Sequence, residues 1–177
     1  NLYKAYKCKA DEYYKKSDYE QALSYYLKAD KSLNACDHNS EYWDIEQAYS
    51  LNLIALCYKK LYNYEYADTL FAEAIKNYQA VKDTTDKNVA TFYSNLAGSK
   101  AEQLQDGYSN LLHKASIGIL QRDTTNEDNE KDIIENYHGL IKNHLQADSL
   151  EQAMFFIEET FKQVDKATVD FCNTNLY

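Results

Sequence analysis

Small and apolar residues recur at helical spacing on both sides of a short polar segment near the start of the chain. Positions three and four residues apart lie on one face of a helix. Before the polar segment these residues are Tyr6, Ala10 and Tyr13, and after it they are Ala22, Leu23, Tyr26, Ala29 and Leu33. The pattern therefore predicts two amphipathic helices joined by a turn of a few residues.

The same arrangement occurs again farther along the chain. Leu51, Ile54, Ala55 and Tyr58 precede a second polar segment, and Ala67, Leu70, Phe71, Ala74, Ile75 and Tyr78 follow it. Four similar turn segments end on a small or apolar residue, at Ala22, Ala67, Leu111 and Ala153. These four residues are 45, 44 and 42 positions apart. Such regularity indicates an internal structural repeat.

Each repeat is predicted to be a pair of antiparallel helices, because a connection of a few residues forces the second helix to fold back on the first. Ser17, Asn63, Asp106 and Ser149 have side chains that suit the N-terminal caps of the second helices. The repeats cover about 1–36, 41–82, 87–122 and 129–166, with the start of another helix at 167–177. Stacked pairs bury faces that one pair leaves open, so a single domain over residues 1–177 is expected.

Composition agrees with an all-α fold. The 177 residues include no Pro and only four Gly, so little interrupts a helix and few residues suit the turns of a β-rich protein. Hydrophobic residues make up 45% of the chain, enough for a packed core. The net charge of −9 repels nucleic acid, which argues against such a partner. The longest apolar runs, of about five residues, are too short to span a membrane.

The repeats resemble tetratricopeptide repeats. In that family the first helix carries a large residue, then Leu with a small residue, then Tyr, and the second helix carries Ala, an aromatic residue and Ala. The second repeat fills these places with Leu51, Ile54 and Ala55, Tyr58, Ala67, Phe71 and Ala74, and the first nearly does with Tyr6, Ala10, Tyr13, Ala22, Tyr26 and Ala29. The fit is looser in the third repeat, with Gly98, Ser99, Leu111, Ala115 and Gly118, and in the fourth, with Tyr137, Leu140, Ile141, His144, Ala153, Ile157 and Thr160.

The resemblance implies a right-handed α-solenoid of about four antiparallel helix pairs plus a partial fifth, with a concave side formed by the first helices. The period of 42 to 45 residues is longer than the usual 34 of the family. It is similar to the long repeats of kinesin light chains and of bacterial signalling proteins, in which such modules dock partners or sense ligands.

Counting back from each turn by the spacing of the family predicts which residues line the concave side. The proposed ligand-contacting residues are Lys4, Lys7, Tyr14, Tyr49, Asn52, Lys59, Tyr93, Lys100, His138 and Lys142. Several lysines on this side of an acidic chain point to a protein or peptide ligand that is acidic or phosphorylated. The alternative is that the first helices simply display solvated lysines.

We find no set of residues with the spacing of a catalytic or metal site, and we expect no cofactor. Glu135 and His138 have the Glu-x-x-His spacing of di-iron bundles, but such a site needs a second pair and two more carboxylates. The four Cys form no CxxC pair and fit free thiols in a reducing compartment. We therefore expect a cytoplasmic location.

The sequence thus favours a non-enzymatic scaffold that binds a protein or peptide. Because the first residue is Asn1 rather than Met, we expect a fragment of a larger protein, such as a docking or sensory module of a bacterial signalling or regulatory protein. Uncapped ends of stacked helices also predict end-to-end self-association. Two alternatives stay open: a helical domain of an enzyme, as a metal-binding bundle or a protease-associated domain, and a purely structural spacer.

Overall fold

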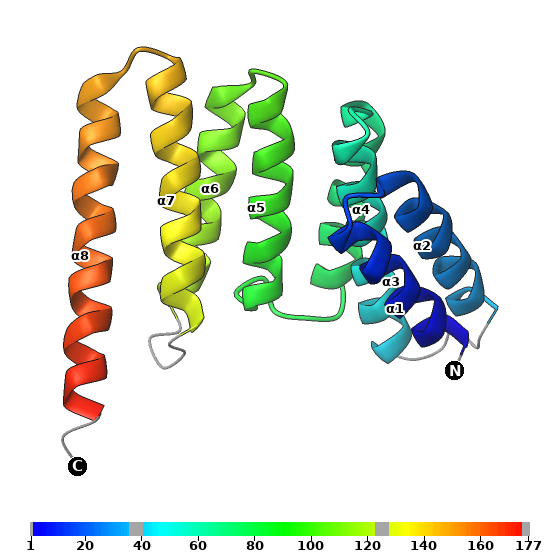
Figure 1. Ribbon diagram of the computed structural model, residues 1–177. Coiled ribbons are helices and arrows are strands. Elements are labelled where there is room, and N and C mark those ends of the chain that lie inside the picture. The colour runs from blue at the N-terminus through cyan, green and yellow to red at the C-terminus, as the bar shows by residue number, and fades with distance from the viewer. Residues whose placement is uncertain (1, 36–40, 123–127, 175–177) are drawn as a thin grey trace. The chain divides into compact units, whose positions relative to one another are not determined.

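The computed structural model describes residues 2–35, 41–122 and 128–174, with side chains for 2–35, 41–122 and 129–165, and every regular element in these ranges is an α-helix (Figure 1). The helices are α1 (Leu2–Lys15), α2 (Tyr19–Leu33), α3 (Glu41–Lys60), α4 (Tyr64–Gln79), α5 (Lys87–Glu102), α6 (Asp106–Leu120), α7 (Asp128–Gln146) and α8 (Leu150–Thr174). The predicted all-α class is confirmed.

The helices pair into four antiparallel hairpins, α1–α2, α3–α4, α5–α6 and α7–α8 (Figure 1). The chain divides into two compact units, Asn1–Thr84 and Thr85–Tyr177, and each unit holds two hairpins. In the first unit α2 packs against α3, and in the second unit α6 packs against α7. Within each unit, the second helix of one hairpin is therefore covered by the first helix of the next, as stacked helical repeats require.

All four hairpins use the same backbone turn. The first helix ends at a left-handed residue, which is Ser17, Tyr62, Leu104 or Asp148, with φ of 60°, 62°, 58° and 57° respectively. The next amide donates to the carbonyl five residues earlier, from Asp18 to Tyr13 at 3.0 Å, Asn63 to Tyr58 at 2.9 Å, Gln105 to Lys100 at 2.9 Å and Ser149 to His144 at 2.8 Å. This is a Schellman motif, which satisfies carbonyls that a helix end leaves without partners.

The turns correct the repeat register in the third hairpin. Five residues after each left-handed residue stand Ala22, Ala67, Ser109 and Ala153, and all four are buried. Leu111, which the sequence comparison aligned with the three alanines, is 66% exposed, so that alignment is wrong by two residues. The corrected intervals are 45, 42 and 44 residues. All four side chains are small, which suits burial between packed helices, and Ser109 keeps that property.

The helix caps agree with the sequence analysis in part. Asn63 caps α4 as predicted, with Oδ1 accepting from the Tyr66 amide at 3.4 Å. Asp18, rather than Ser17, caps α2 by accepting from the Gln21 amide at 3.1 Å. Asp106 is the first residue of α6 and not its cap. The Ser149 hydroxyl donates to the Ala147 carbonyl instead of accepting from a helix amide.

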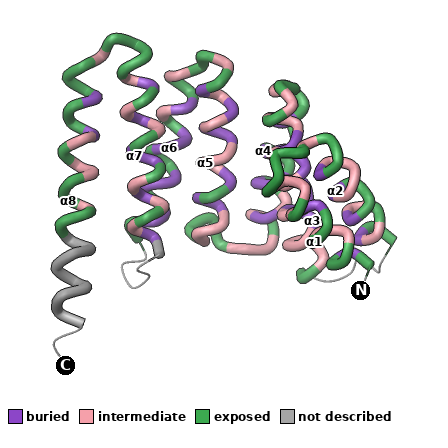
Figure 2. The backbone as a smooth tube through the Cα atoms, viewed as in Figure 1, coloured by how far each residue is buried: buried purple, intermediate pink, exposed green. Residues whose placement is uncertain are grey.

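Buried residues occur on helices of both units (Figure 2). Ala10 and Ala22 in the first hairpin, and Ala55 and Ala67 in the second, are completely buried, which lets the paired helices approach closely. Cys57 belongs to the same core, and burial raises the pKa of its thiol to about 12. The thiol therefore stays protonated at neutral pH and packs as a small apolar group.

The last helix is longer than the sequence analysis predicted. α8 runs without a break from Leu150 to Thr174, so the predicted start of a separate helix at residue 167 is wrong. No Gly or Pro occurs between Thr160 and Phe171, and nothing else in that segment ends a helix.

Leu104 is the left-handed residue of the third hairpin, and its side chain is 76% exposed. A side chain with a Cβ atom is strained at positive φ, whereas Gly is not. We expect Leu104→Gly to raise the free energy of unfolding by about 0.5–1 kcal/mol, measured by urea denaturation. Leu104→Ala is the control, because it removes the same exposed side chain and keeps the Cβ atom. Equal stability of the two variants would contradict a left-handed residue here.

Candidate functional site

The first helices of the first unit bring Lys7 and Tyr49 together. The Lys7 Nζ atom lies 5.9 Å from the ring centre of Tyr49 on α3 and 5.8 Å from that of Tyr3 on α1. Glu46 Oε2 lies 4.0 Å from Lys7 Nζ and accepts a 2.6 Å hydrogen bond from the Tyr3 hydroxyl. Burial, reinforced by that bond to Glu46, raises the pKa of Tyr3 above its ordinary value. Tyr3 therefore remains a neutral hydrogen-bond donor at neutral pH.

The other candidates in the first unit differ in how open they are. Lys4 is exposed, whereas Tyr14 and Lys59 are half-buried. The Tyr14 ring packs edge-on against Tyr19, with 5.3 Å between ring centres. Asn52 is only 6% exposed, so little of it is open to a ligand. The accessible candidates here are therefore mainly lysines and aromatic rings.

Counting from the left-handed turn residues defines equivalent first-helix positions, which we call groove positions. The residues 13 and 10 before each turn residue are Lys4 and Lys7, Tyr49 and Asn52, Thr91 and Ser94, and Glu135 and His138. In the third hairpin the shifted register instead predicts Tyr93 and Lys100. These two residues take the places of Leu51 and Tyr58, which pack between helices in the second hairpin.

Tyr93 and Lys100 are both half-buried on α5. The Lys100 ammonium lies 5.4 Å from the ring centre of Tyr108 on α6. Lys100 thus spans the packed surface of its own hairpin and keeps its charge at the edge, as long basic side chains commonly do. His138 and Lys142 are exposed on α7, four residues apart, and therefore share one face of that helix.

A polar cleft of about 70 Å³ lies between α5 and α7. It is lined by Thr91, Ser94, Asn95, Ser116, Leu120, Asp132, Glu135 and Asn136. Ser116 and Leu120 come from α6 and are buried, so they form the floor, while Thr91 and Glu135 are exposed at the sides. The cleft contains three of the groove positions of the second unit. The cleft could not be predicted from the sequence, because the shifted register moves the α5 positions away from Thr91 and Ser94.

Buried polar side chains join α6 to α7 below the cleft. His113 Nδ1 lies 2.9 Å from Asn136 Oδ1, and Asn143 Nδ2 donates to Ser109 Oγ at 2.8 Å. Asn136 Nδ2 donates to the Asp132 carbonyl at 2.7 Å, which fixes the amide with its oxygen toward His113. His113 must therefore carry its proton on Nδ1 to donate to that oxygen.

This polar layer replaces the apolar packing of the second hairpin. Ser109, His113 and Ser116 occupy the places that Ala67, Phe71 and Ala74 fill there. The signal in the sequence is Ser, His and Ser at the spacing of Ala, aromatic and Ala, and it is recognisable only after the register has been corrected.

Within the described ranges, no three His, Cys, Asp or Glu side chains come together where they could hold a metal ion. In that part of the chain, Glu135 and His138 therefore have no further His, Cys, Asp or Glu placed to complete a metal site with them. No helix of the described part is sufficiently long and apolar to cross a bilayer.

Comparisons with known proteins identify the fold. No family model and no curated protein matches the sequence. BtubC from P. vanneervenii superposes with a TM-score of 0.75 and 20% identity, over 99% of this chain and 65% of that one. Aspartyl phosphate phosphatase F from Bacillus subtilis gives 0.80 and 16%, over 95% of this chain and 42% of that one. The TPR-like repeats of a Podosopora anserina protein assigned as a kinesin light chain give 0.75 and 12%, over 92% and 75%.

These structures share the tetratricopeptide-like fold, and at such identities the likeness concerns the fold alone. The chain is therefore an α-helical repeat protein of the tetratricopeptide-like fold, as its sequence predicted. It spans less than two thirds of the length of BtubC and of the Bacillus phosphatase.

The packing of His113 in the polar layer predicts how a substitution at Gly139 on α7 changes stability. A Cβ atom there would lie 2.2 Å from His113 Nε2, a distance that real Cβ atoms do not show. Gly→Ala in a helix interior normally stabilises by up to about 1 kcal/mol. Here we expect Gly139→Ala to destabilise the protein by about 1–3 kcal/mol, because the His113 ring must move from its bond with Asn136. Chemical denaturation measures the change.

Gly118→Ala on α6 is the matched control, because nothing lies within 4 Å of a Cβ atom there. We expect this variant to be as stable as wild type or more so. If Gly139→Ala were also neutral, His113 would not pack over Gly139. Combining Gly139→Ala with His113→Ala should remove most of the added cost.

Proposed function

We propose that the chain is a non-enzymatic scaffold that binds a protein or peptide along its first helices. The observation that carries this proposal is the repeated helical hairpin with its common turn, in a chain whose fold is similar to solved tetratricopeptide-like structures. Repeats of this kind serve as binding surfaces, since each displays side chains at equivalent places on its first helix. The residues proposed to contact the ligand in the first unit are Lys4, Lys7, Tyr14, Tyr49, Asn52 and Lys59.

The chemistry of these positions in the first unit favours an acidic ligand. Lys7 lies between two tyrosine rings, and Lys4 is exposed one turn before it. Glu46 is near, but a partly exposed pair separated by 4.0 Å is weak and leaves Lys7 able to bind a carboxylate. Lysine beside aromatic rings is a common combination in peptide recognition.

In the second unit His138 and Lys142 remain the proposed contacts, and Thr91 and Ser94 replace Tyr93 and Lys100. We further propose that the chain is the docking or sensory module of a larger bacterial signalling or regulatory protein in the cytoplasm. The likeness to a Bacillus phosphatase that is more than twice as long supports this proposal. An enzyme's helical domain or a structural spacer would bind no peptide at the groove positions, which is the basis of the test.

The test is selection from a random peptide library on the whole chain, followed by NMR mapping of a synthesised peptide. We expect chemical-shift changes on α1, α3, α5 and α7. Lys4→Glu combined with Lys7→Glu should weaken an acidic peptide about tenfold or more, because a favourable charge pair becomes a repulsive one. Lys31→Glu combined with Lys76→Glu makes the same charge change at exposed positions of α2 and α4, and should leave affinity within about twofold. Changes confined to α2, α4, α6 and α8, or no selected peptide, would contradict the proposal.

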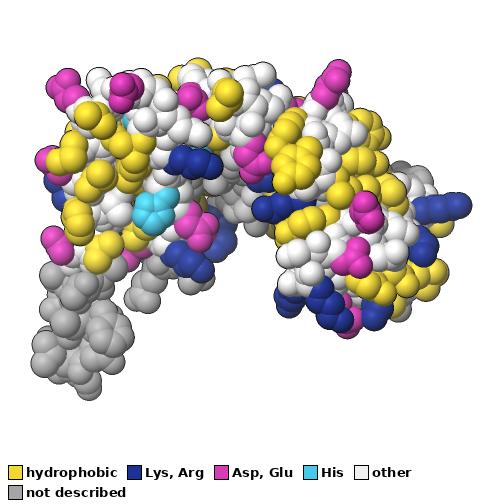
Figure 3. Space-filling view, turned by 45° about the horizontal axis from the view of Figure 1, so that its top comes forward, with side chains coloured by type: hydrophobic (Ala, Val, Ile, Leu, Met, Phe, Trp, Pro, Cys, Tyr) yellow, Lys and Arg dark blue, Asp and Glu magenta, His cyan; other side chains and the backbone are white. Residues whose placement is uncertain are grey.

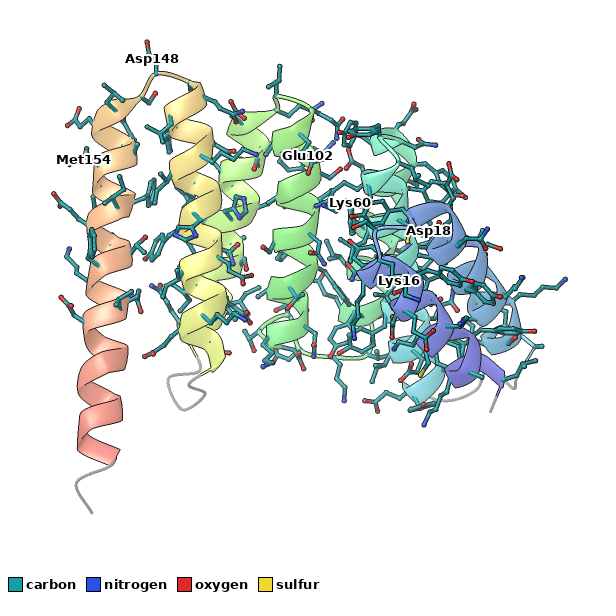
Figure 4. All side chains as sticks on the ribbon, viewed as in Figure 1. Lys16, Asp18, Lys60, Glu102, Asp148 and Met154 are labelled. Atoms are coloured by element: carbon teal, nitrogen blue, oxygen red, sulfur yellow. The ribbon has the colours of Figure 1, made fainter. Side chains whose placement is uncertain are left out.

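We also propose self-association through the outer face of α8. Its residue Phe161 is 65% exposed, whereas the equivalent Asp30 of α2 is bonded to Gln47 and Ser50 of α3, and the equivalent Ile117 of α6 is buried. Figure 3 shows hydrophobic side chains gathered over α8, and Figure 4 shows Met154 pointing away from α7. α3 covers the equivalent face of α2, and α7 covers that of α6. A helix from a second copy, packed on α8 in the same way, would cover this face.

Analytical ultracentrifugation tests the self-association. We expect the sedimentation coefficient of wild type to rise with concentration, and that of Met154→Glu combined with Phe161→Glu to stay constant. Leu27→Glu, which adds charge at an exposed apolar position of α2, is the control and should behave as wild type. A concentration-independent monomer for wild type would reject a contact between copies.

A further inference from the structure

The polar cleft of the second unit is built from three helices in a regular way. Thr91, Ser94 and Asn95 lie on one face of α5, and Asp132, Glu135 and Asn136 lie at the same spacing on α7. Ser116 and Leu120 of α6 close the floor. Seven of the eight lining side chains are polar, and none of the eight is basic. The cleft is therefore a preformed polar site on the groove side of the unit.

The hydrogen bonds inside the unit leave mainly acceptors facing the cleft. The Ser116 hydroxyl donates its proton to the Ala90 carbonyl at 2.9 Å, and the Thr91 hydroxyl donates to the Lys87 carbonyl at 3.3 Å. Each hydroxyl has one proton, so both oxygens can only accept from a ligand. Asn136 is also committed, through its bonds to His113 and to the Asp132 carbonyl. A ligand that donates several hydrogen bonds is thus favoured over one that accepts them.

Two carboxylates add negative charge to these acceptors. Neither Asp132 nor Glu135 forms an ion pair with any Lys, Arg or His in the described part of the chain. An ionised carboxylate is an acceptor only, and its hydrogen bonds with a cation are about twice as strong as neutral ones. The site therefore favours a positively charged donor.

The size of the cleft limits what can enter. One water molecule needs about 10–15 Å³ of such space, so about 70 Å³ holds a group of a few non-hydrogen atoms. The ammonium end of Lys and the guanidinium of Arg are of this size. Both end long flexible side chains that can reach a cleft from a peptide lying along α5 and α7.

We propose that this cleft binds the Lys or Arg side chain of a peptide ligand, with Asp132 and Glu135 pairing its charge and with Thr91 and Ser116 accepting further hydrogen bonds. The inference rests on the proposed peptide-binding function. The first unit is proposed to bind acidic groups of the ligand. The inference adds that the same ligand needs a basic side chain at the second unit.

The experiment uses the whole chain and the random peptide library. We expect peptides selected on wild type to contain Lys or Arg at one fixed position, and the amides of Thr91 and Ser94 to shift on binding. Replacing that residue by norleucine, which keeps the length of Lys without its charge, should lower affinity at least tenfold by calorimetry. Asp132→Asn combined with Glu135→Gln should lower the affinity of the basic peptide similarly, and should make the norleucine change nearly neutral.

Glu151→Gln combined with Glu158→Gln is the control for net charge, because both residues are exposed on α8 and the net charge changes equally. We expect this control to bind the basic peptide as wild type does. Equal loss in both double variants would mean non-specific attraction to an acidic protein and would overturn the inference. The selected peptides could instead shift first-helix amides and keep their affinity when norleucine replaces each Lys or Arg. That result would overturn the inference and leave the proposed function intact. Failure to select any peptide would overturn both.

Discussion

The left-handed turn between paired helices sets how each hairpin folds. At Ser17, Tyr62, Leu104 and Asp148 one residue at positive φ lets two amides bond back to the end of the first helix, so the second helix must return alongside it. In each hairpin a small residue that is buried stands five positions later. Pairing and register therefore follow from one local event, repeated four times with different residues.

Much of this fold could be predicted from sequence, because only small side chains fit between closely packed helices. Ala22, Ala67 and Ala153 stand at equivalent buried places, and their spacing alone indicated repeated hairpins. The third hairpin is misleading because Ser109 replaces Ala, while Tyr108 and Leu111 form a similar pair of an aromatic and an apolar residue that is shifted by two positions. None of the four left-handed residues is Gly, so the sequence gives no direct mark of where each turn lies.

The candidate site could be predicted less well, for a related physical reason. A shift of two residues on a helix turns a side chain by more than half a revolution, so Tyr93 takes the place of Leu51 in the second hairpin, whereas Thr91 takes the groove position of Tyr49. The polar layer around His113 depends on contacts between α6 and α7, which no local pattern encodes. The first unit displays lysines beside tyrosine rings, while the second offers acceptors and carboxylates. A ligand that met both surfaces would need charges of both signs.

Amide hydrogen exchange at Gln105 and Gly107 tests most directly whether the third hairpin shares the common turn. The Gln105 amide donates to the Lys100 carbonyl, whereas the Gly107 amide lies in the first turn of α6, where no earlier helix carbonyl is available. We expect slow exchange at Gln105, comparable with Asp18, Asn63 and Ser149, and fast exchange at Gly107. Protection at Gly107 with fast exchange at Gln105 would restore the shifted register and remove the basis for both the groove positions and the cleft.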